Sequence, residues 1–353
     1  MAMRREMRKG DDDPSTTYHN SERISDPTDS QLTCSVTCIT FSPSGSLVAG
    51  GLEDASVRVW ERDNTAQAEI LGYHIRDTVQ AITFSPDGAF VLSGSLDRTA
   101  FIWAVGQPSA GPVAELVGHQ EAVTAAAWSP DGLHIVTGSE DGSMRLWDAK
   151  TQEQIAEWGS LIVPILSLAF SPDGRRVASG SAGHLLRIWD RDSGQTISSS
   201  MHTAAVNAVS FSPDGSRVLC GSQDGSVWIW GNSGSLLSLK LKSHQGRVLG
   251  VGFSADSSRV ASGASDGTLN IWSPSINEIN AIHERSADVT CLAFSPHGLH
   301  AARGHSDGTI IIDELPEMSP GIPPDEASPP EVVHPAEVPE VSLEAAHNDG
   351  QGC

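Results

Sequence analysis

The sequence predicts an all-β fold, a seven-bladed β-propeller, from two features that recur in phase. An aromatic residue followed by Ser-Pro-Asp-Gly or a near match occurs seven times, 41 to 44 residues apart. The seven are Phe41, Phe84, Trp128, Phe170, Phe211, Phe253 and Phe294. A Trp stands 19 residues after each of the first six. Units of about 40–45 residues that each hold four short strands are typical of propeller blades.

The second unit shows how each blade is expected to form. Its four apolar-rich runs are Thr78–Phe84, Phe90–Ser95, Ala100–Val105 and Ala114–Val117. Ser85-Pro86-Asp87-Gly88 separates the first two, because Pro presets φ and Gly accepts positive φ in a tight turn. A loop insertion, Gly106–Pro112, precedes the fourth run. Such short runs between turn residues favour strands over helices.

Charge and proline content divide the chain into three parts. The net charge is −22, and residues 313–353 hold ten acidic and no basic residues together with eight prolines. We expect the tail, residues 314–353, to be disordered, because such composition buries too little apolar surface to offset chain entropy. Residues 36–313 form the predicted propeller. Residues 1–35 are expected to be mostly disordered, with a short strand near Glu22–Asp26 that closes the last blade.

Composition also excludes several classes of protein. The apolar runs are far shorter than the ~20 residues that a membrane span needs. Five Cys without CxxC spacing disfavour a disulfide scaffold and a zinc ribbon. Asp11–Asp13 follow the basic start where a secretory signal would be apolar, so we expect a cytoplasmic or nuclear protein. The acidic balance disfavours direct binding to nucleic acid or anionic membranes.

The units resemble WD repeats. Gly138-Ser139-Glu140-Asp141-Gly142-Ser143-Met144-Arg145-Leu146-Trp147-Asp148, preceded by Gly118-His119, carries the resemblance most fully, and it extends over about 36–313. The resemblance implies a structural tetrad of His, Ser or Thr, Asp and Trp in each blade. The matching residues are His74, Ser93, Asp97 and Trp103 in the second unit, His119, Thr137, Asp141 and Trp147 in the third, and His244, Ser262, Asp266 and Trp272 in the sixth.

The other units depart from this tetrad. The fifth has Cys220 at the hydroxyl position, and the fourth has Gly183 at the Asp position and lacks the His. The first lacks the His, and the seventh has Arg303 and Asp313 within its repeat. Because buried polar groups need partners, we expect blades one, four and seven to be less stable than the others.

The resemblance also implies a partner-binding face, at the start of the innermost strands. The residues expected there are Thr37, Gln80, Thr124, Leu166, Asn207, Leu249 and Thr290, with Arg247 beside them. A second candidate is the apolar stretch around blade four, which includes Trp158, Leu161 and Ile165. This stretch either forms an exposed contact patch or folds into the core.

These observations predict a non-enzymatic scaffold that binds proteins or peptides within an intracellular complex, as a monomeric propeller and without cofactor or metal. Gly263–Gly267 and Gly304–Gly308 match GxSxG, but they fall in strand–strand turns rather than in the strand–helix turn that a nucleophile needs.

Three alternatives remain: a ubiquitin-ligase substrate receptor, a sensing array of a larger multidomain protein, and an enzyme. Arg145, Trp147 and Asp148 motivate the first, although Lys150 replaces the Arg of the adaptor-docking motif.

Overall fold

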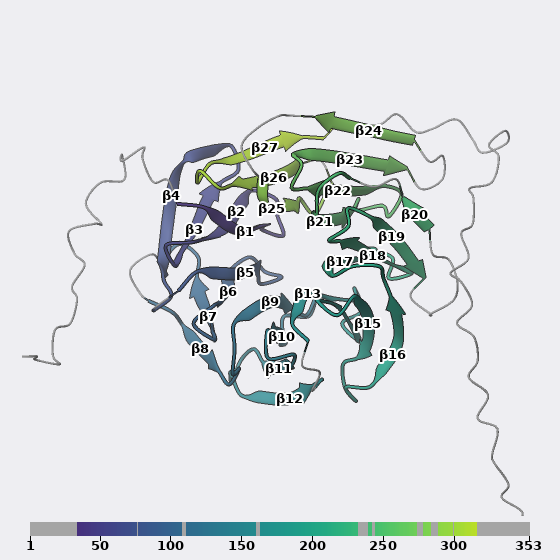
Figure 1. Ribbon diagram of the computed structural model, residues 1–353. Helices are drawn as coiled ribbons and strands as arrows, with labels where there is room; N and C mark the ends of the chain where they lie inside the picture. The colour runs from purple at the N-terminus through teal and green to yellow at the C-terminus, as the bar shows by residue number, and fades with distance from the viewer. Residues whose placement is uncertain are drawn as a thin grey trace, which may run out of the picture. The chain divides into compact units, whose positions relative to one another are not determined.

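The described strands form seven antiparallel sheets arranged as blades of a ring (Figure 1). The computed structural model describes residues 34–75, 77–107, 111–159, 163–231, 239–241, 244–273, 278–283, 289–298 and 300–315. Six sheets have four strands, and the seventh has three among the described residues. The predicted seven-bladed all-β propeller is therefore confirmed.

The strands follow one another from the centre of the ring outward in each blade. Blade one contains β1 (Val36–Phe41), β2 (Leu47–Leu52), β3 (Ser56–Glu61) and β4 (Asn64–Tyr73), and blade two contains β5 (Val79–Phe84), β6 (Phe90–Ser95), β7 (Thr99–Ala104) and β8 (Ala114–Val117). Blade three contains β9 (Val123–Trp128), β10 (His134–Ser139), β11 (Met144–Asp148) and β12 (Gln154–Trp158), and blade four contains β13 (Ile165–Phe170), β14 (Arg176–Ser181), β15 (Leu185–Asp190) and β16 (Thr196–Met201). Blade five contains β17 (Val206–Phe211), β18 (Arg217–Ser222), β19 (Val227–Gly231) and β20 (Leu239–Leu241), and blade six contains β21 (Val248–Phe253), β22 (Val260–Ala264), β23 (Thr268–Ser273) and β24 (Glu278–His283). Blade seven contains β25 (Val289–Phe294), β26 (His300–His305) and β27 (Ile310–Glu314).

The Ser-Pro-Asp-Gly phrase forms the turn between the first and second strands. In blade two, the Ser85 hydroxyl donates to Asp87 Oδ1 at 2.5 Å, and the amide of Gly88 donates to the Ser85 carbonyl at 2.9 Å. Gly88 has a φ of 73°, which an L side chain rarely adopts. The turn therefore needs these residue types, and this requirement explains why the phrase recurs.

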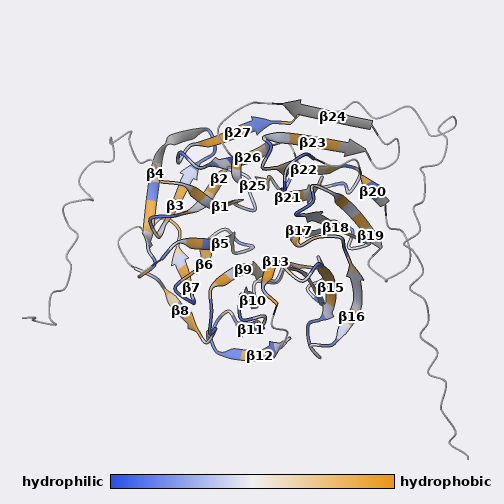
Figure 2. Cartoon of the chain, in the orientation of Figure 1, coloured by the Kyte–Doolittle hydropathy of each residue, from blue (hydrophilic) through white to orange (hydrophobic). Residues whose placement is uncertain are grey.

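The core lies between adjacent blades. Phe101 and Trp103 of β7 belong to one buried cluster with Val57 and Val59 of β3, so this face of blade two packs on blade one. In the same way, Trp60 of blade one packs on blade seven, in a cluster with Cys291. Figure 2 shows hydrophobic colour on the inner strand β13 and hydrophilic colour on the outer strand β12.

The ring closes where blade seven meets blade one. The Thr290 hydroxyl of β25 donates to the Val36 carbonyl of β1 at 2.5 Å, and Cys291 lies in the buried cluster with Val36. We call this junction the seam. The strand predicted near Glu22–Asp26 lies outside the described residues. At the other end, β27 reaches Glu314, and Leu315 is buried.

Candidate functional site

Inner-strand threonines tie neighbouring blades together on the mouth face, the side of the ring where the first strands of the blades begin. The Thr37 hydroxyl donates to the Val79 carbonyl of blade two, and Thr124 donates to the Ile165 carbonyl of blade four at 2.5 Å. Thr290 makes the equivalent bond across the seam. These three predicted partner-binding residues are half-buried and engaged within the ring. They hold the mouth rigid, which favours a face that presents loops in fixed positions.

The other predicted mouth residues differ in exposure. Gln80, Leu166, Asn207 and Leu249 are half-buried, whereas Arg247 is exposed. The Asn207 amide donates to Gln223 Oε1 at 2.9 Å, and Leu249 packs against a core cluster. Leu161 lies outside the described residues.

Acidic side chains are also exposed on the mouth face, beside the turn aspartates of the repeat. Glu53 and Glu140 occupy equivalent turns of blades one and three, beside the repeat aspartates, and both are exposed. Glu121 is also exposed, and Arg98 lies 3.6 Å from it. The fixed position between the second and third strands of each repeat identifies Glu53 and Glu140 in the sequence, whereas Glu121 precedes the first strand of blade three.

The apolar stretch of blade four folds inward where it is described. Trp158 and Ile165 are buried in one cluster with Trp189, and a Cβ added at Gly183 would lie 2.7 Å from Val163 Cγ1. Of the two interpretations of this stretch, core packing therefore holds for Trp158 and Ile165. Val163 occupies the space beside the position where other blades carry the tetrad Asp.

The tetrad of blade two forms a continuous hydrogen-bonded chain. His74 Nδ1 lies 3.1 Å from Asp97 Oδ2, and His74 Nε2 lies 2.7 Å from Ser93 Oγ. The indole of Trp103 donates to the same Ser93 oxygen at 2.8 Å. This arrangement satisfies four polar side chains inside an otherwise apolar interface, as buried polar groups require.

The equivalent residues of blade three repeat this chain. His119 lies 3.1 Å from Asp141 and 2.8 Å from Thr137, whose hydroxyl accepts from Trp147 at 2.9 Å. Burial opposes ionisation of Asp141, but hydrogen bonds from Ser143 and from backbone amides outweigh it and lower the pKa of Asp141 to about 2. Burial also lowers the pKa of His119. An imidazole held neutral between two partners has a structural role here.

In blade six, the hydrogen-bonded chain of the tetrad links its His to a Thr instead of to the Asp. His244 Nε2 lies 2.8 Å from the Ser262 hydroxyl, while His244 Nδ1 lies 2.5 Å from the Thr268 hydroxyl and 3.9 Å from Asp266. Asp266 instead accepts the backbone amide of Gln245 at 2.7 Å. The side chain of Trp272 lies outside the described residues.

Arginine networks replace the tetrad in the two blades that flank the seam. In blade one, Arg58 donates to Asp54 at 2.8 Å and to the Ser56 hydroxyl at 2.9 Å. In blade seven, Arg303 and Asp313 occupy the positions of the hydroxyl and the Trp, and the guanidinium donates twice to the carboxylate at 2.7 and 2.8 Å. The Arg303 side chain is 1% exposed, so this is a buried bidentate ion pair.

Blade five has a sulfur at the hydroxyl position of the tetrad, and its Asp224 accepts hydrogen bonds from the Thr203 and Ser226 hydroxyls. Cys220 Sγ lies 3.6 Å from His202 Nε2, and Trp230 Nε1 is buried without a hydrogen bond of ordinary geometry among the described residues. Sulfur is a weak acceptor. Burial lowers the pKa of His202 to about 4 and raises the pKa of Cys220 to about 12. The Cys220 thiol is therefore protonated at neutral pH and is a poor nucleophile.

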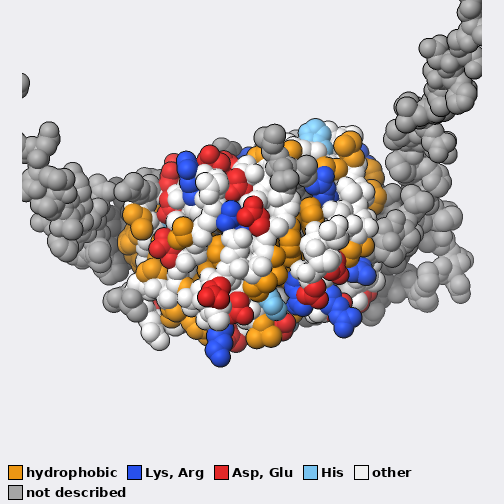
Figure 3. All heavy atoms as spheres, turned by 90° about the horizontal axis from the view of Figure 1, so that it is seen from below, with side chains coloured by type: hydrophobic (Ala, Val, Ile, Leu, Met, Phe, Trp, Pro, Cys, Tyr) orange, Lys and Arg blue, Asp and Glu red, His pale blue; other side chains and the backbone are white. Residues whose placement is uncertain are grey.

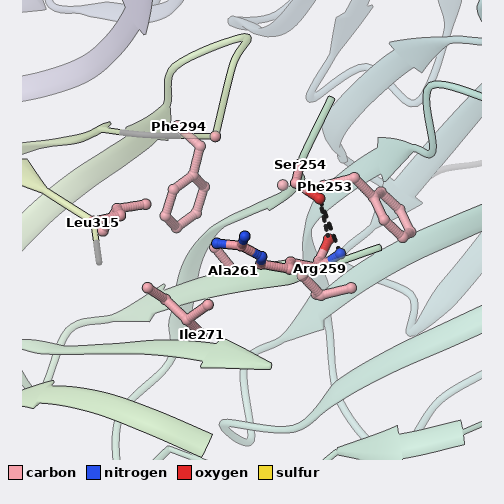
Figure 4. A pocket seen from close by; sticks show the side chains of 10 residues that line it. Phe253, Ser254, Arg259, Ala261, Ile271, Phe294 and Leu315 are labelled. Atoms are coloured by element: carbon pink, nitrogen blue, oxygen red, sulfur yellow. Dashed lines mark hydrogen bonds between the residues drawn. The ribbon is translucent and has the colours of Figure 1, made fainter. Parts of the chain in front are cut away.

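The described residues show few features of an active site. Burial also raises the pKa of the Cys38 thiol to about 12, and the described part contains no group of three or more His, Cys, Asp or Glu residues placed to hold a metal. A cavity of about 20 Å³ lies between blades six and seven, lined by Phe253, Arg259 and Leu315 (Figure 4). It has room for about one water molecule, whereas ligand pockets measure about 300–1,000 Å³.

Most of the exposed large apolar side chains lie on or beside the outer strands of blades one to four. In the described part, the large ones are Tyr73, Ile75, Val113, Val117, Leu133, Ile155, Ile197 and Met201. Figure 3 shows such side chains on the rim among charged and neutral neighbours. No helix long and apolar enough to span a membrane occurs among the residues searched.

Two family models match the chain. One, described as WD domain, G-beta repeat, matches residues 28–61, 67–104 and 110–148. The other, described as IFT122 first beta-propeller, matches residues 164–321. The comparison with curated proteins gave no match.

Proposed function

The chain belongs to the WD-repeat β-propellers, and from this premise we propose that it is a non-enzymatic scaffold whose mouth face binds protein or peptide partners. The fold fits a protein-interaction scaffold, because WD-repeat propellers are generally non-enzymatic and bind proteins. The proposal includes a place in a cytoplasmic or nuclear hetero-complex. A fold alone does not assign a function, so the support for this proposal comes from the residues of the mouth face.

One observation carries the proposal: the mouth face combines a rigid ring with exposed charged side chains. Threonine bonds of 2.5 Å join blade three to four and blade seven to one, so the turns above them are held in place. Glu53, Glu140 and Arg247 project from this framework as exposed residues. Charged groups around a preorganised surface give specificity and fast association with a partner of complementary charge.

The test compares two charge-reversal variants of the full chain by tagged purification and mass spectrometry. Glu53→Lys/Glu140→Lys alters the mouth face, and Asp63→Lys/Glu153→Lys alters exposed turns on the opposite face. Circular dichroism verifies that both fold. We expect partners to be lost only from the first variant. Equal recovery of all partners with both variants would contradict the proposal.

A second candidate function, as the sensing repeat array of a larger multidomain protein, is favoured by one comparison. The model matching blades four to seven is described as a first β-propeller, which names one propeller of several. This candidate predicts that peptides from a further domain accompany residues 34–315 in the native protein. Mass-spectrometric mapping of the endogenous protein after denaturing purification tests it, because non-covalent partners are then removed.

A further inference from the structure

The rim where blades one and two meet presents carboxylates and apolar side chains together. On blade two, β7 pairs with β8 so that Phe101 lies opposite Glu115 and Thr99 lies opposite Val117. Cross-strand partners share one face of a sheet. Phe101 packs on blade one, so Glu115 and Val117 lie on the same side, towards β4.

Blade one contributes the other side of this rim. Glu69 of β4 pairs with Val59, which packs on blade two, so Glu69 lies on the face directed towards β7 and β8. The two blades are in close contact here, since a Cβ added at Gly72 would lie 2.3 Å from Trp103 Cζ3. Figure 1 places β4 and β8 as neighbours on the outside of the ring.

Apolar side chains continue this surface towards the mouth face. Ile75 follows His74, whose ring stacks on Phe101 at 4.5 Å. Val117 is 65% and Ile75 is 69% exposed. We define the blade one–two rim as Glu69, Ile75, Glu115 and Val117. Exposed large apolar side chains that share one rim are typical of a contact surface.

The carboxylates indicate which partner fits. Glu69 Oε1 is buried without a hydrogen-bond partner among the described residues. Glu115 is exposed, and in the described part neither glutamate forms an ion pair with a Lys or Arg. A half-buried carboxylate with an unpaired oxygen is costly, and a basic side chain that approaches the accessible part of the carboxylate would offset this cost through its charge.

We propose that the blade one–two rim binds a segment of a partner protein that carries a Lys or Arg flanked by apolar side chains. The basic group pairs with Glu69 and Glu115, and the flanking side chains cover Val117 and Ile75. This rim is separate from the mouth face, so the proposal extends the scaffold function to a second surface.

The experiment selects ligands for the full chain from a phage-displayed library of random short peptides. Selected peptides are synthesised, and their affinities are measured by fluorescence polarisation. We expect enriched peptides to contain Lys or Arg next to apolar residues. Their affinity should fall at least about fivefold with Glu115→Gln and with Val117→Ser. The matched control is Ile155→Ser, which removes an equally apolar rim residue, 51% exposed, from blade three and should leave affinity unchanged.

A charge exchange tests direct pairing. Glu115→Lys should weaken binding of the basic peptide and restore binding of a peptide whose Lys or Arg is replaced by Glu. Circular dichroism verifies that each variant is folded. Enriched peptides without a basic residue, or affinities insensitive to Glu115 and Val117, would overturn the proposal. Peptides that respond only to Glu53→Lys/Glu140→Lys would also overturn it, while supporting the mouth-face function.

Discussion

Cys220→Ser should stabilise the protein, because blade five carries a sulfur at the position where blade two carries the hydroxyl of its tetrad. In blade two, Ser93 Oγ accepts from Trp103 at 2.8 Å and lies 2.7 Å from His74. In blade five, Cys220 Sγ lies 3.6 Å from His202, and Trp230 Nε1 is buried without an ordinary hydrogen bond. A serine hydroxyl at position 220 would supply the missing acceptor and a stronger partner for the imidazole.

The magnitude follows from the groups that change. Two neutral hydrogen bonds contribute about 0.5–1.5 kcal/mol each to the free energy of unfolding. Serine is smaller and more polar than cysteine, and the lost packing at a site that is fully buried offsets about half of this gain. We therefore expect a net increase of about 1 kcal/mol, or roughly 2 °C in the thermal midpoint for a domain of this size.

Thermal unfolding followed by circular dichroism measures the effect in a double-mutant cycle with Trp230→Phe, which removes the indole donor. The gain from Cys220→Ser should shrink by about half when it is measured in the Trp230→Phe variant. The reverse change, Ser93→Cys, should destabilise blade two by a similar amount. If Cys220→Ser lowers the midpoint, or if its gain is the same with and without the indole, the hydrogen-bond reasoning is wrong.

Three further predictions concern the blades and their seam. Arg303→Met alone should lower the free energy of unfolding by about 3–5 kcal/mol because it leaves Asp313 buried and unpaired, whereas Arg303→Met/Asp313→Leu should be near neutral; denaturant unfolding compares them. His202 has a pKa of about 4, below its ordinary ~6.5, so the unfolded chain binds more protons and stability falls as pH drops from about 6.5 to about 4. His202→Gln should remove up to roughly 3 kcal/mol of that fall, and an unchanged pH slope would refute the assignment. Thr290→Val should cost about 1 kcal/mol and should speed amide exchange at Val36 more than at Val123, as hydrogen exchange would show.

The sequence was sufficient for the architecture because turn chemistry and core packing repeat in phase. The Asp87-Gly88 turn needs a residue with positive φ, and Trp103 packs at the interface with blade one. Because these two requirements recur from blade to blade, the spacing of such residues along the sequence predicts the blades. The contacts of the mouth residues could not be predicted from the sequence. Thr37 and Thr124 share a position with Gln80 and Leu166, yet their hydroxyls bind the neighbouring blade. The inter-blade distance that brings a carbonyl within reach of a hydroxyl is not encoded in the spacing within one repeat.

The blades that depart from the tetrad show a second limit of prediction from the sequence. If each position is compared with the tetrad separately, Arg303 and Asp313 count as two lost tetrad residues in blade seven. In the structure these two residues form one bidentate ion pair. Arg58 likewise supplies from β3 the partner that Asp54 lacks from a His. The substitution in blade four is different in kind, because Val163 packs against Gly183 and the His–Asp pair is replaced by apolar contact.

These substitutions revise the expected order of blade stability. Blades one, four and seven were predicted to be the least stable because each lacks part of the tetrad. Apolar replacement of a buried polar pair is often neutral or stabilising, so blade four need not be weaker than its neighbours. The Arg303–Asp313 pair carries a desolvation penalty that its two hydrogen bonds offset only in one geometry. Such a pair favours one arrangement of blade seven over nearby alternatives. Blade seven is also where the ring must meet Val36 in register for the Thr290 bond to form. Geometric specificity at the seam, rather than added stability, is therefore the physical role that we assign to this pair.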